Sequence, residues 1–303
     1  METALRHLSQ QEQINFLLTN RIPRRALTQF IGWYSRIESP WLARLSIAAW
    51  KQFADLDLSE AERQEFSSVH ACFTRRLKAD ARPLDERPEV MVSPCDAVVG
   101  ECGPIAGTTV FQAKGFPYEI GDLIPDPALQ EKYRDGCYAT LRLKSSMYHR
   151  FHAPVDCAVD EVRYISGDTW NVNPIALKRI EKLYCRNERA VVPLNDTATA
   201  GGICLVPVAA ILVASMKFHC LPDELDLRSR GQNRIRCSAS YRKGDEMGYF
   251  QHGSTIIVFA TSNYALSEGI SQGQTIRMGQ ALMTDTSYAA PAPLPREAAT
   301  PTT

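Results

Sequence analysis

The stretch 248-GYFQHGSTIIVFA-260 sets the fold class expected for most of the chain. Both of its ends are rich in aromatic and β-branched residues, which are typical of strands. Between them, 252-HGS-254 contains a glycine, which reaches positive φ without steric cost and therefore marks a turn. Taken alone, these residues predict two strands joined by a tight turn, and a hairpin corner is the simplest interpretation.

Other segments carry the same strand signal, namely short runs of apolar and β-branched residues bounded by turn residues. They are 90–94, 108–115, 138–144, 158–166, 182–194, 203–215 and 255–260. Before about residue 85, apolar residues recur at helical spacing instead. That spacing predicts helices over 10–20, 24–37 and 40–53, and a further helix from Ser59, where 59-SEAE-62 resembles a capping box.

These patterns predict an α+β fold in three parts. A helical segment covers residues 1–85, and a β-rich core covers residues 86–288. Residues 289–303 are rich in proline, alanine and threonine, a composition typical of disorder.

Composition excludes several classes of protein. Lysine plus arginine and aspartate plus glutamate both number 34, so the chain lacks the basic excess of a nucleic-acid-binding protein. The nine cysteines are scattered without a Cys-x-x-Cys pair, which favours reduced thiols over a disulfide framework or a zinc site. We expect no metal. The N-terminal residues lack the pattern of a signal peptide, and the longest apolar run, 203–216, contains a proline and is too short to span a bilayer.

The predicted helix 40-PWLARLSIAAWKQF-53 allows two interpretations. It combines tryptophan and aliphatic residues with Arg44 and Lys51. A basic amphipathic helix of this kind can lie in a membrane interface. Equally, its apolar residues can pack on the rest of the protein, as they do in most amphipathic helices.

Three polar residues of the β-rich core could together activate a hydroxyl group. Asp96 follows a predicted strand end, His152 lies in 145-SSMYHRFHAPVD-156, and Ser254 opens the last predicted strand. An aspartate can orient an imidazole, which then takes the proton of a serine hydroxyl. Each residue also has a purely structural interpretation: Asp96 as a turn residue, His152 as an accidental neighbour of His149, and Ser254 as part of a hairpin.

The surroundings of Ser254 lack the Gly-x-Ser-x-Gly elbow of a hydrolase. The carbonyl of Gly253, directly before it, is an alternative target, and glycine offers little steric hindrance there. Attack by the hydroxyl would form an ester between Gly253 and Ser254. Elimination would then split the chain and leave Ser254 as a dehydroalanine, which hydrolyses to a pyruvoyl group.

Motifs spread over nearly the whole chain give it a family resemblance. They are 73-FTRRLKADARPLD-85, 93-SPCDAVVG-100, 112-QAKGFPYEIGDLI-124, 148-YHRFHAPVD-156, 167-GDTWNVNP-174, 184-YCRNERAVV-192 and 243-KGDEMGYFQHGSTIIVF-259. In this combination and order, the chain resembles bacterial pyruvoyl-dependent phosphatidylserine decarboxylases. The resemblance implies a β-rich decarboxylase core that follows a membrane-associating helical segment.

The resemblance also implies site residues and a cofactor. Asp96, His152 and Ser254 match the residues for self-cleavage, which would fall between Gly253 and Ser254. His149 matches a histidine close to the substrate that takes part in decarboxylation. The implied cofactor is pyruvate, as a covalent pyruvoyl group made from Ser254, and it would bind the amine of phosphatidylserine as a Schiff base. Phosphatidylethanolamine would be the product.

By the same resemblance, the mature protein would pair a β chain of residues 1–253 with an α chain of residues 254–303, and this unit would form a homodimer. It would lie at the cytoplasmic face of the bacterial inner membrane, bound to its anionic surface. Met147 departs from the family pattern, which commonly has aspartate there, so a partner of His149 could be missing. Two alternatives therefore stay open: a pyruvoyl decarboxylase of a soluble amino acid, and a lipid-binding homologue without catalysis.

Overall fold

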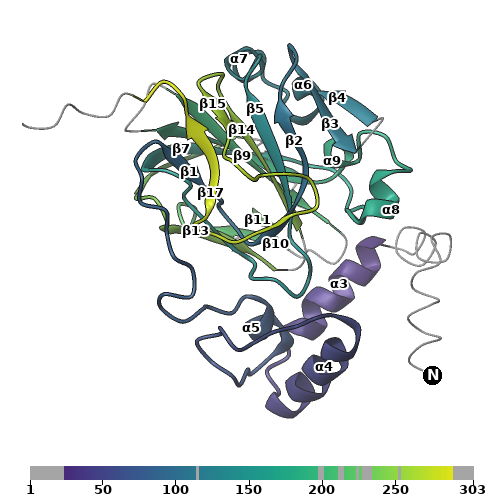
Figure 1. The fold of residues 1–303 in the computed structure, drawn as a ribbon. Helices are drawn as coiled ribbons and strands as arrows, with labels where there is room; N and C mark the ends of the chain where they lie inside the picture. Colours follow the sequence, from purple (N-terminus) through teal and green to yellow (C-terminus); the bar gives the residue numbers. More distant parts are fainter. Residues whose placement is uncertain are drawn as a thin grey trace, which may run out of the picture.

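The computed structural model describes residues 24–113, 116–196, 201–210, 215–222, 225–226, 234–251 and 254–288. The helix predicted over 10–20, the tail 289–303, and His252 and Gly253 of the predicted cleavage site lie outside the described residues. Within them the protein is a mixed α and β structure, and strands predominate (Figure 1).

An antiparallel sheet of eight strands is the largest layer of the molecule (Figure 1). Strands β9 and β14 are buried along their whole length, because other layers cover both faces of the sheet there. The centre of the sheet is therefore also the centre of the core. In spatial order the strands are β12 (Arg234–Tyr241), β7 (Cys157–Ile165), β8 (Arg189–Asp196), β9 (Gly202–Ala209), β14 (Ser254–Ala260), β5 (Cys137–Arg142), β2 (Ala97–Pro104) and β16 (Thr275–Ile276).

Three smaller sheets pair the remaining strands. One contains β11 (Leu225–Asp226), β10 (Ser215–Phe218), β13 (Glu246–Phe250) and β6 (Arg150–His152), in that order. The others pair β1 (Val90–Val92) with β17 (Ala281–Asp285) and β15 (Tyr264–Leu266), and β3 (Thr109–Ala113) with β4 (Phe116–Glu119). Gly248 lets β13 approach β10 closely, since a Cβ atom at this position would lie 2.0 Å from the Lys217 carbonyl oxygen.

The hairpin interpretation of the opening stretch is wrong. Strand β13 pairs with β10 and β6, whereas β14 pairs with β9 and β5. Strands β13 and β14 therefore belong to different sheets and do not pair with each other. The local pattern could not reveal this, because every pairing partner comes from a distant part of the sequence.

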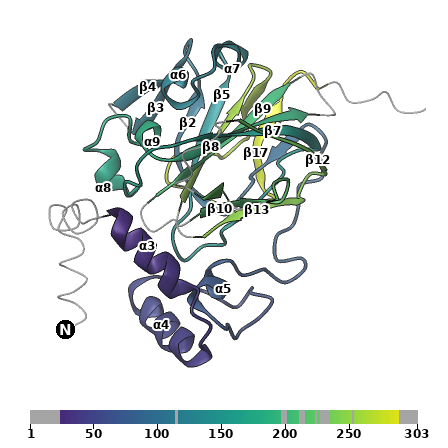
Figure 2. The same cartoon turned by 180° about the vertical axis from the view of Figure 1, so that it is seen from behind.

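Three helices lie together on one side of the sheets (Figures 1 and 2). They are α3 (Arg24–Ser35), α4 (Pro40–Phe53) and α5 (Val69–Phe73), and the first two lie where the sequence predicts helices. Helix α4 begins at Pro40, and the hydroxyl of its N-cap Ser39 accepts a hydrogen bond from the Leu42 N–H. The apolar residues of this region form a small core of their own: Ala43, Ile47, Leu56, Leu58, Ala61 and Cys72.

Four short helices flank the strands, and they are α6 (Ile120–Leu123), α7 (Pro127–Lys132), α8 (Pro174–Leu177) and α9 (Leu183–Arg186). The single strand predicted over 182–194 is wrong in its first part. That part forms helix α9, and the strand begins only at Arg189. The strand predicted over 203–215 ends at Ala209. The first range mixes charged and apolar residues and the second is a continuous apolar run, and neither pattern marks where its strand begins or ends.

The helix predicted from Ser59 is also wrong. Asp57 accepts hydrogen bonds from both the N–H and the hydroxyl of Ser59, so the chain forms a local turn. Ala61 then forms an isolated β-bridge with Leu77. A helix begins only at Val69, after the N-cap Ser68. The spacing of Ser59 and Glu62 resembles a capping box. The Asp57 carboxylate instead accepts hydrogen bonds from Ser59, so the Ser59 hydroxyl does not cap a helix.

Candidate active site

Ser254 is the first residue of β14, and its side chain is buried. It lies opposite Ala209 of β9, and its carbonyl oxygen accepts a hydrogen bond of 2.9 Å from the Leu143 N–H. Among the described residues, no group forms a hydrogen bond with its hydroxyl. A buried polar group left in this state costs about 1–3 kcal/mol. No contact among the described residues depends on this hydroxyl, so it is available for chemistry.

His152 ends β6, and both of its ring nitrogens have partners. Nδ1 lies 2.8 Å from the Gly244 carbonyl oxygen, and Nε2 lies 3.0 Å from the Tyr148 hydroxyl. A carbonyl oxygen can only accept a hydrogen bond, so Nδ1 carries the proton and donates it to Gly244. Nε2 of the neutral ring consequently accepts a hydrogen bond from Tyr148. The basic nitrogen of His152 is therefore Nε2.

The environment keeps the His152 imidazole in its neutral form. Burial lowers its pKa below the ordinary value, because desolvation disfavours the charged ring. The hydrogen bond to Gly244 and the carboxylates of Glu246 and Asp96 oppose this effect without cancelling it. A histidine that is neutral near pH 7 can accept a proton, as a general base must.

Asp96 lies between β1 and β2 and forms a buried ion pair with Arg82. The Arg82 Nε and Nη2 atoms donate to the two carboxylate oxygens at 2.8 and 2.5 Å. The Met278 N–H donates a third hydrogen bond to Asp96 at 2.9 Å. Arg82 also binds Glu60 at 2.8 Å, so it connects the helical part of the chain to this carboxylate. Bidentate pairing of this kind fixes the orientation of both groups.

The structure brings some of the predicted site residues together and leaves others unconnected. The His152 N–H donates to the Pro94 carbonyl oxygen at 2.8 Å, which places His152 beside the loop of Asp96. The ring of His152 is nevertheless bonded to Tyr148 and Gly244, not to Asp96 or to the Ser254 hydroxyl, among the parts of the chain that the structure describes. Asp96 and His152 are thus neighbours, and the three residues do not form a bonded relay.

His149 is fully buried directly before β6. Its Nδ1 lies 2.8 Å from the Met147 carbonyl oxygen, so Nδ1 carries the proton of the neutral ring and Nε2 carries the lone pair. The Phe73 ring lies against it, with 4.0 Å between the ring centroids. Its carbonyl oxygen accepts a hydrogen bond of 3.0 Å from the Phe250 N–H, four residues before Ser254.

The His149 ring has a hydrogen-bond partner at position 147 although this residue is methionine and not the aspartate common in the family. The backbone carbonyl of residue 147 binds the Nδ1 proton of His149, and any side chain at this position can supply that carbonyl. The Met147 sulfur instead accepts a hydrogen bond from the Lys144 N–H at 3.4 Å. The tautomer of His149 therefore does not require a carboxylate at position 147.

Sequence reasoning missed four residues that hold the predicted ones. Tyr148 and Gly244 bind the His152 ring, Arg82 binds Asp96, and Phe73 covers His149. All four lie inside motifs quoted above, 73-FTRRLKADARPLD-85, 148-YHRFHAPVD-156 and 243-KGDEMGYFQHGSTIIVF-259. Their presence in those motifs could have marked them as candidate site residues, but a motif does not show which atoms a residue binds.

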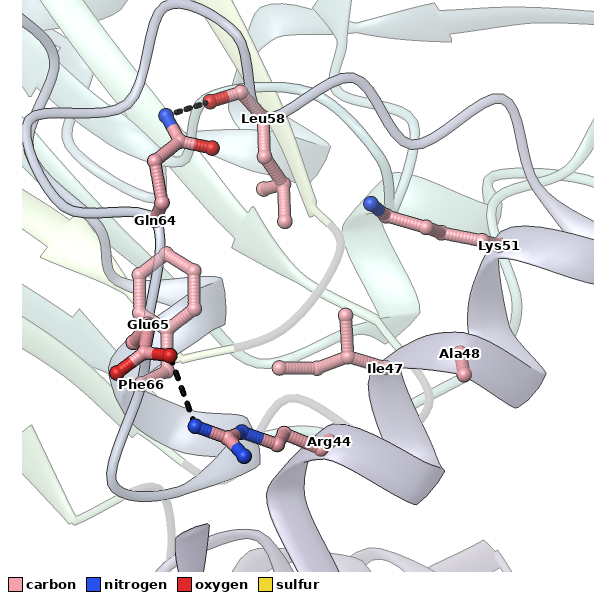
Figure 3. Close-up of a pocket in the computed structure, with 8 residues that line it drawn as sticks. All are labelled: Arg44, Ile47, Ala48, Lys51, Leu58, Gln64, Glu65 and Phe66. Atoms are coloured by element: carbon pink, nitrogen blue, oxygen red, sulfur yellow. Dashed lines mark hydrogen bonds and ion pairs between the residues drawn. The ribbon is translucent and has the colours of Figure 1, made fainter. Parts of the chain in front are cut away.

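A hollow of about 220 Å³ lies between α4 and the segment that follows it (Figure 3). Arg44 and Glu65 form an ion pair of 2.8 Å at its rim, and the Gln64 side chain donates to the Leu58 carbonyl. None of the predicted catalytic residues lines it. The hollow therefore belongs to the helical part of the protein, and the catalytic candidates lie in the packed core beside the sheets.

Within the described residues, no cluster of three or more histidine, cysteine, aspartate or glutamate side chains could bind a metal ion. No helix among them is long and apolar enough to cross a membrane.

Comparisons with known proteins agree with one another. A family model described as phosphatidylserine decarboxylase matches residues 69–284. A phosphatidylserine decarboxylase proenzyme of Alkalilimnicola ehrlichii is 35% identical over 267 residues, which cover 84% of this chain and 92% of the relative. Proenzymes of the same description from Sodalis glossinidius and Brevibacillus brevis are 33% and 32% identical, over 89% and 88% of this chain and 95% and 96% of the relatives.

Proposed function

The chain belongs to the phosphatidylserine decarboxylase family, and we propose that it converts phosphatidylserine to phosphatidylethanolamine with a pyruvoyl group made from its own Ser254. The observation that carries the residue assignment is the buried Ser254 hydroxyl without a described partner at the start of β14. This side chain fits a residue that is later consumed, because no contact among the described residues depends on the oxygen that would be lost.

Self-cleavage begins when the Ser254 oxygen attacks the Gly253 carbonyl carbon, and the peptide bond between Gly253 and Ser254 then breaks, so that an ester forms and the Ser254 nitrogen takes up a proton as a free amine. His152 is the proposed base, since its Nε2 carries the lone pair and burial keeps it neutral. Tyr148 occupies Nε2 in the structure, so this hydrogen bond must be exchanged before the serine proton can be taken. The resulting ester loses the α-proton of Ser254 as its Cβ–oxygen bond breaks, and Gly253 leaves with a free carboxylate. Water then replaces the nitrogen of the dehydroalanine, which departs as ammonia, and the pyruvoyl carbonyl remains.

In the mature enzyme, the pyruvoyl group would supply a carbonyl that binds the substrate amine and withdraws electrons as carbon dioxide leaves. His149 is the proposed proton carrier. With Nδ1 bound to the Met147 carbonyl, its Nε2 is the nitrogen that can hold the proton returned to the substrate α-carbon. The surrounding apolar residues exclude water from this step.

The proposed membrane contact rests on α3 and α4. They expose large apolar side chains that a folded protein normally buries: Phe30, Trp33, Trp41, Leu45 and Phe53 are between 52 and 77% exposed. Arg44 and Lys51 lie on the same helix as three of them. Such a face suits the interface of an anionic bilayer, with the rings among the acyl chains and the cations at the headgroups. We infer peripheral binding at the cytoplasmic face of a bacterial inner membrane.

This exposed face favours a lipid over a soluble amino acid, because a soluble substrate has no need of a membrane contact. The buried residues proposed for self-cleavage likewise favour an enzyme over a lipid-binding homologue. The proposed mature form contains a β chain of residues 1–253 and an α chain of residues 254–303, and we propose that this unit forms a homodimer.

Denaturing electrophoresis and intact-mass spectrometry of the purified protein test the proposal first. We expect two chains split between Gly253 and Ser254, with a pyruvoyl group at the start of the shorter one. Release of carbon dioxide should then be measured with phosphatidylserine vesicles and, separately, with free amino acids. Release from free amino acids alone would replace the lipid substrate. A single uncleaved chain would favour the lipid-binding alternative.

Replacing Tyr148 with phenylalanine tests how His152 is tuned. The tyrosine donates to Nε2 and thereby stabilises the neutral imidazole, so its loss should raise the pKa of His152. A protonated histidine cannot act as a base. The acid side of the pH profile of self-cleavage should therefore shift to higher pH, by about 0.5–1 unit if the bond contributes a typical 1 kcal/mol.

Tyr164→Phe is the matched control for this measurement. Tyr164 is a buried tyrosine of β7, and its hydroxyl binds Glu188 at 3.0 Å. Its loss should lower stability without moving the pH profile. A Tyr148→Phe profile that coincides with the wild type would show that the Tyr148 hydroxyl does not influence the base.

A further inference from the structure

Two short segments bind each other on both sides of His149. The Arg75 Nη2 atom donates to the Ser146 carbonyl oxygen at 2.9 Å. In return, the Arg150 Nη2 and Nε atoms donate to the Thr74 carbonyl oxygen at 2.6 and 3.0 Å. Both arginine side chains are largely buried, and hydrogen bonds from charged donors are stronger than neutral ones. The end of α5 is therefore fixed to the segment that contains His149.

These hydrogen bonds hold Phe73, the last residue of α5, against the ring of His149. Its ring centroid lies 4.0 Å from that of His149, the planes are tilted by 40°, and both residues are buried. The Nδ1 hydrogen bond to Met147 sets the tautomer of the ring. The adjacent Phe73 ring restricts its rotation, because the space that a rotated imidazole would need is occupied.

Helix α4 supports Phe73 from the other side. The Trp50 and Phe73 rings are stacked, with centroids 5.8 Å apart and planes within 10°. Ala43 and Ile47, on the same face of α4, belong to the small core that includes Cys72 of α5. The opposite face of α4 exposes Trp41, Leu45 and Phe53. One helix thus presents its outer face to solvent and its inner face to the aromatic ring that contacts His149.

We propose that Trp50 and Phe73 are positioning residues for His149, through which the packing of α4 against α5 sets the orientation of the imidazole. This inference rests on the proposed function for its catalytic meaning, but its geometric content concerns the uncleaved chain. It gives the helical part of the protein a role in the chemistry as well as in membrane attachment. It also explains why the end of α5 is bound so firmly to the histidine segment.

The geometric part can be measured without any activity. In the uncleaved Ser254→Ala protein, NMR of labelled histidine should show the His149 ring protons displaced by the neighbouring aromatic ring. Phe73→Leu should abolish this displacement, and Trp50→Leu should reduce it or broaden the signals. Trp50→Phe should preserve it, because a stacked ring is kept, and Trp41→Leu on the outer face should leave it unchanged. Unchanged His149 signals in both leucine variants would overturn the proposal.

The catalytic part is measured on cleaved enzyme with two forms of substrate, phosphatidylserine vesicles and short-chain phosphatidylserine dispersed in water. Phe73→Leu and Trp50→Leu should lower kcat by about tenfold or more on both forms, with little change in KM, since small displacements of a reacting group are costly. Trp50→Phe should retain most of the rate. Trp41→Leu, on the outer face of α4, should weaken binding to vesicles.

The outcomes separate this inference from the proposed function. A wild-type protein that stays uncleaved or releases no carbon dioxide refutes the proposed function, and the NMR comparison still decides whether the two rings position His149. A wild-type enzyme that is active, with leucine variants whose kcat values are within twofold of it, refutes the positioning role alone. If Phe73→Leu does not fold, the partly exposed Trp50 gives the same comparison.

Discussion

Ser254→Ala should yield a single chain of 303 residues with no measurable decarboxylation of phosphatidylserine. Alanine has no oxygen to attack the Gly253 carbonyl, so neither the chain break nor the pyruvoyl group can form. Because the wild-type hydroxyl is buried without a described partner, its removal should not weaken the fold. Relative to the uncleaved chain with serine at this position, the free energy of unfolding should stay the same or rise by about 1–3 kcal/mol, the cost of an unsatisfied buried polar group.

Thr140→Val provides the matched control. Thr140 lies on the neighbouring strand β5, and its buried hydroxyl likewise has no hydrogen-bond partner among the described residues. Its removal should affect stability in the same direction and leave cleavage intact. Electrophoresis, vesicle decarboxylation and denaturant unfolding of both variants complete the test. Cleavage or decarboxylation that persists in Ser254→Ala would refute the pyruvoyl mechanism at this residue.

Arg82→Leu should produce the largest loss of stability. The substitution leaves the Asp96 carboxylate buried and without the two hydrogen bonds from Arg82, which is 7% exposed in the ion pair. Breaking a buried ion pair on one side typically costs about 3–5 kcal/mol, because the remaining charge has no compensation. Denaturant unfolding should show this loss, and self-cleavage should slow because the Asp96 loop lies beside His152.

A second substitution distinguishes this cause from simple loss of packing. Adding Asp96→Asn to Arg82→Leu removes the uncompensated charge, so the double variant should be more stable than Arg82→Leu alone. The exposed pair of Arg87 with Asp85 is the control, and Arg87→Leu should leave the unfolding midpoint close to that of the wild type. A double variant no more stable than Arg82→Leu would show that the charge of Asp96 is not the cause.

Local patterns predicted the elements that depend on nearby residues. The helices at Arg24–Ser35 and Pro40–Phe53 were foreseen because amphipathic spacing and the proline at position 40 act within a few residues. The helix expected from Ser59 does not form, because the Asp57 carboxylate accepts a hydrogen bond from the Ser59 N–H and holds a turn there. The expected hairpin does not form, because each of its two strands pairs with a distant segment of the chain. Pairing over such separations leaves no trace in a short window of sequence.

In the candidate site, the sequence likewise identified residues but not the contacts between distant parts of the chain. Motifs supplied Asp96, His149, His152 and Ser254, but not the bonds that hold them. The partners of His152 are Tyr148, four residues earlier, and Gly244, 92 residues later, and only the fold brings the second of these to the ring. The chain order aspartate, histidine, serine suggested a relay, whereas in the structure Asp96 binds Arg82. An arginine motif and an aspartate motif cannot reveal their pairing until the chain is folded.

The position of β14 in the middle of the largest sheet has a consequence for the proposed cleavage. Ser254–Ala260 has hydrogen-bonded neighbours on both sides, β9 and β5, and β15, β16 and β17 of the same short product are paired elsewhere in the core. The fragments would therefore stay interlocked without a covalent link, and separating them would require global unfolding. The reactive group made from Ser254 could not be lost by dilution or dialysis, as a diffusible coenzyme can. Each molecule would become active once and permanently, and its replacement would require synthesis of a new chain.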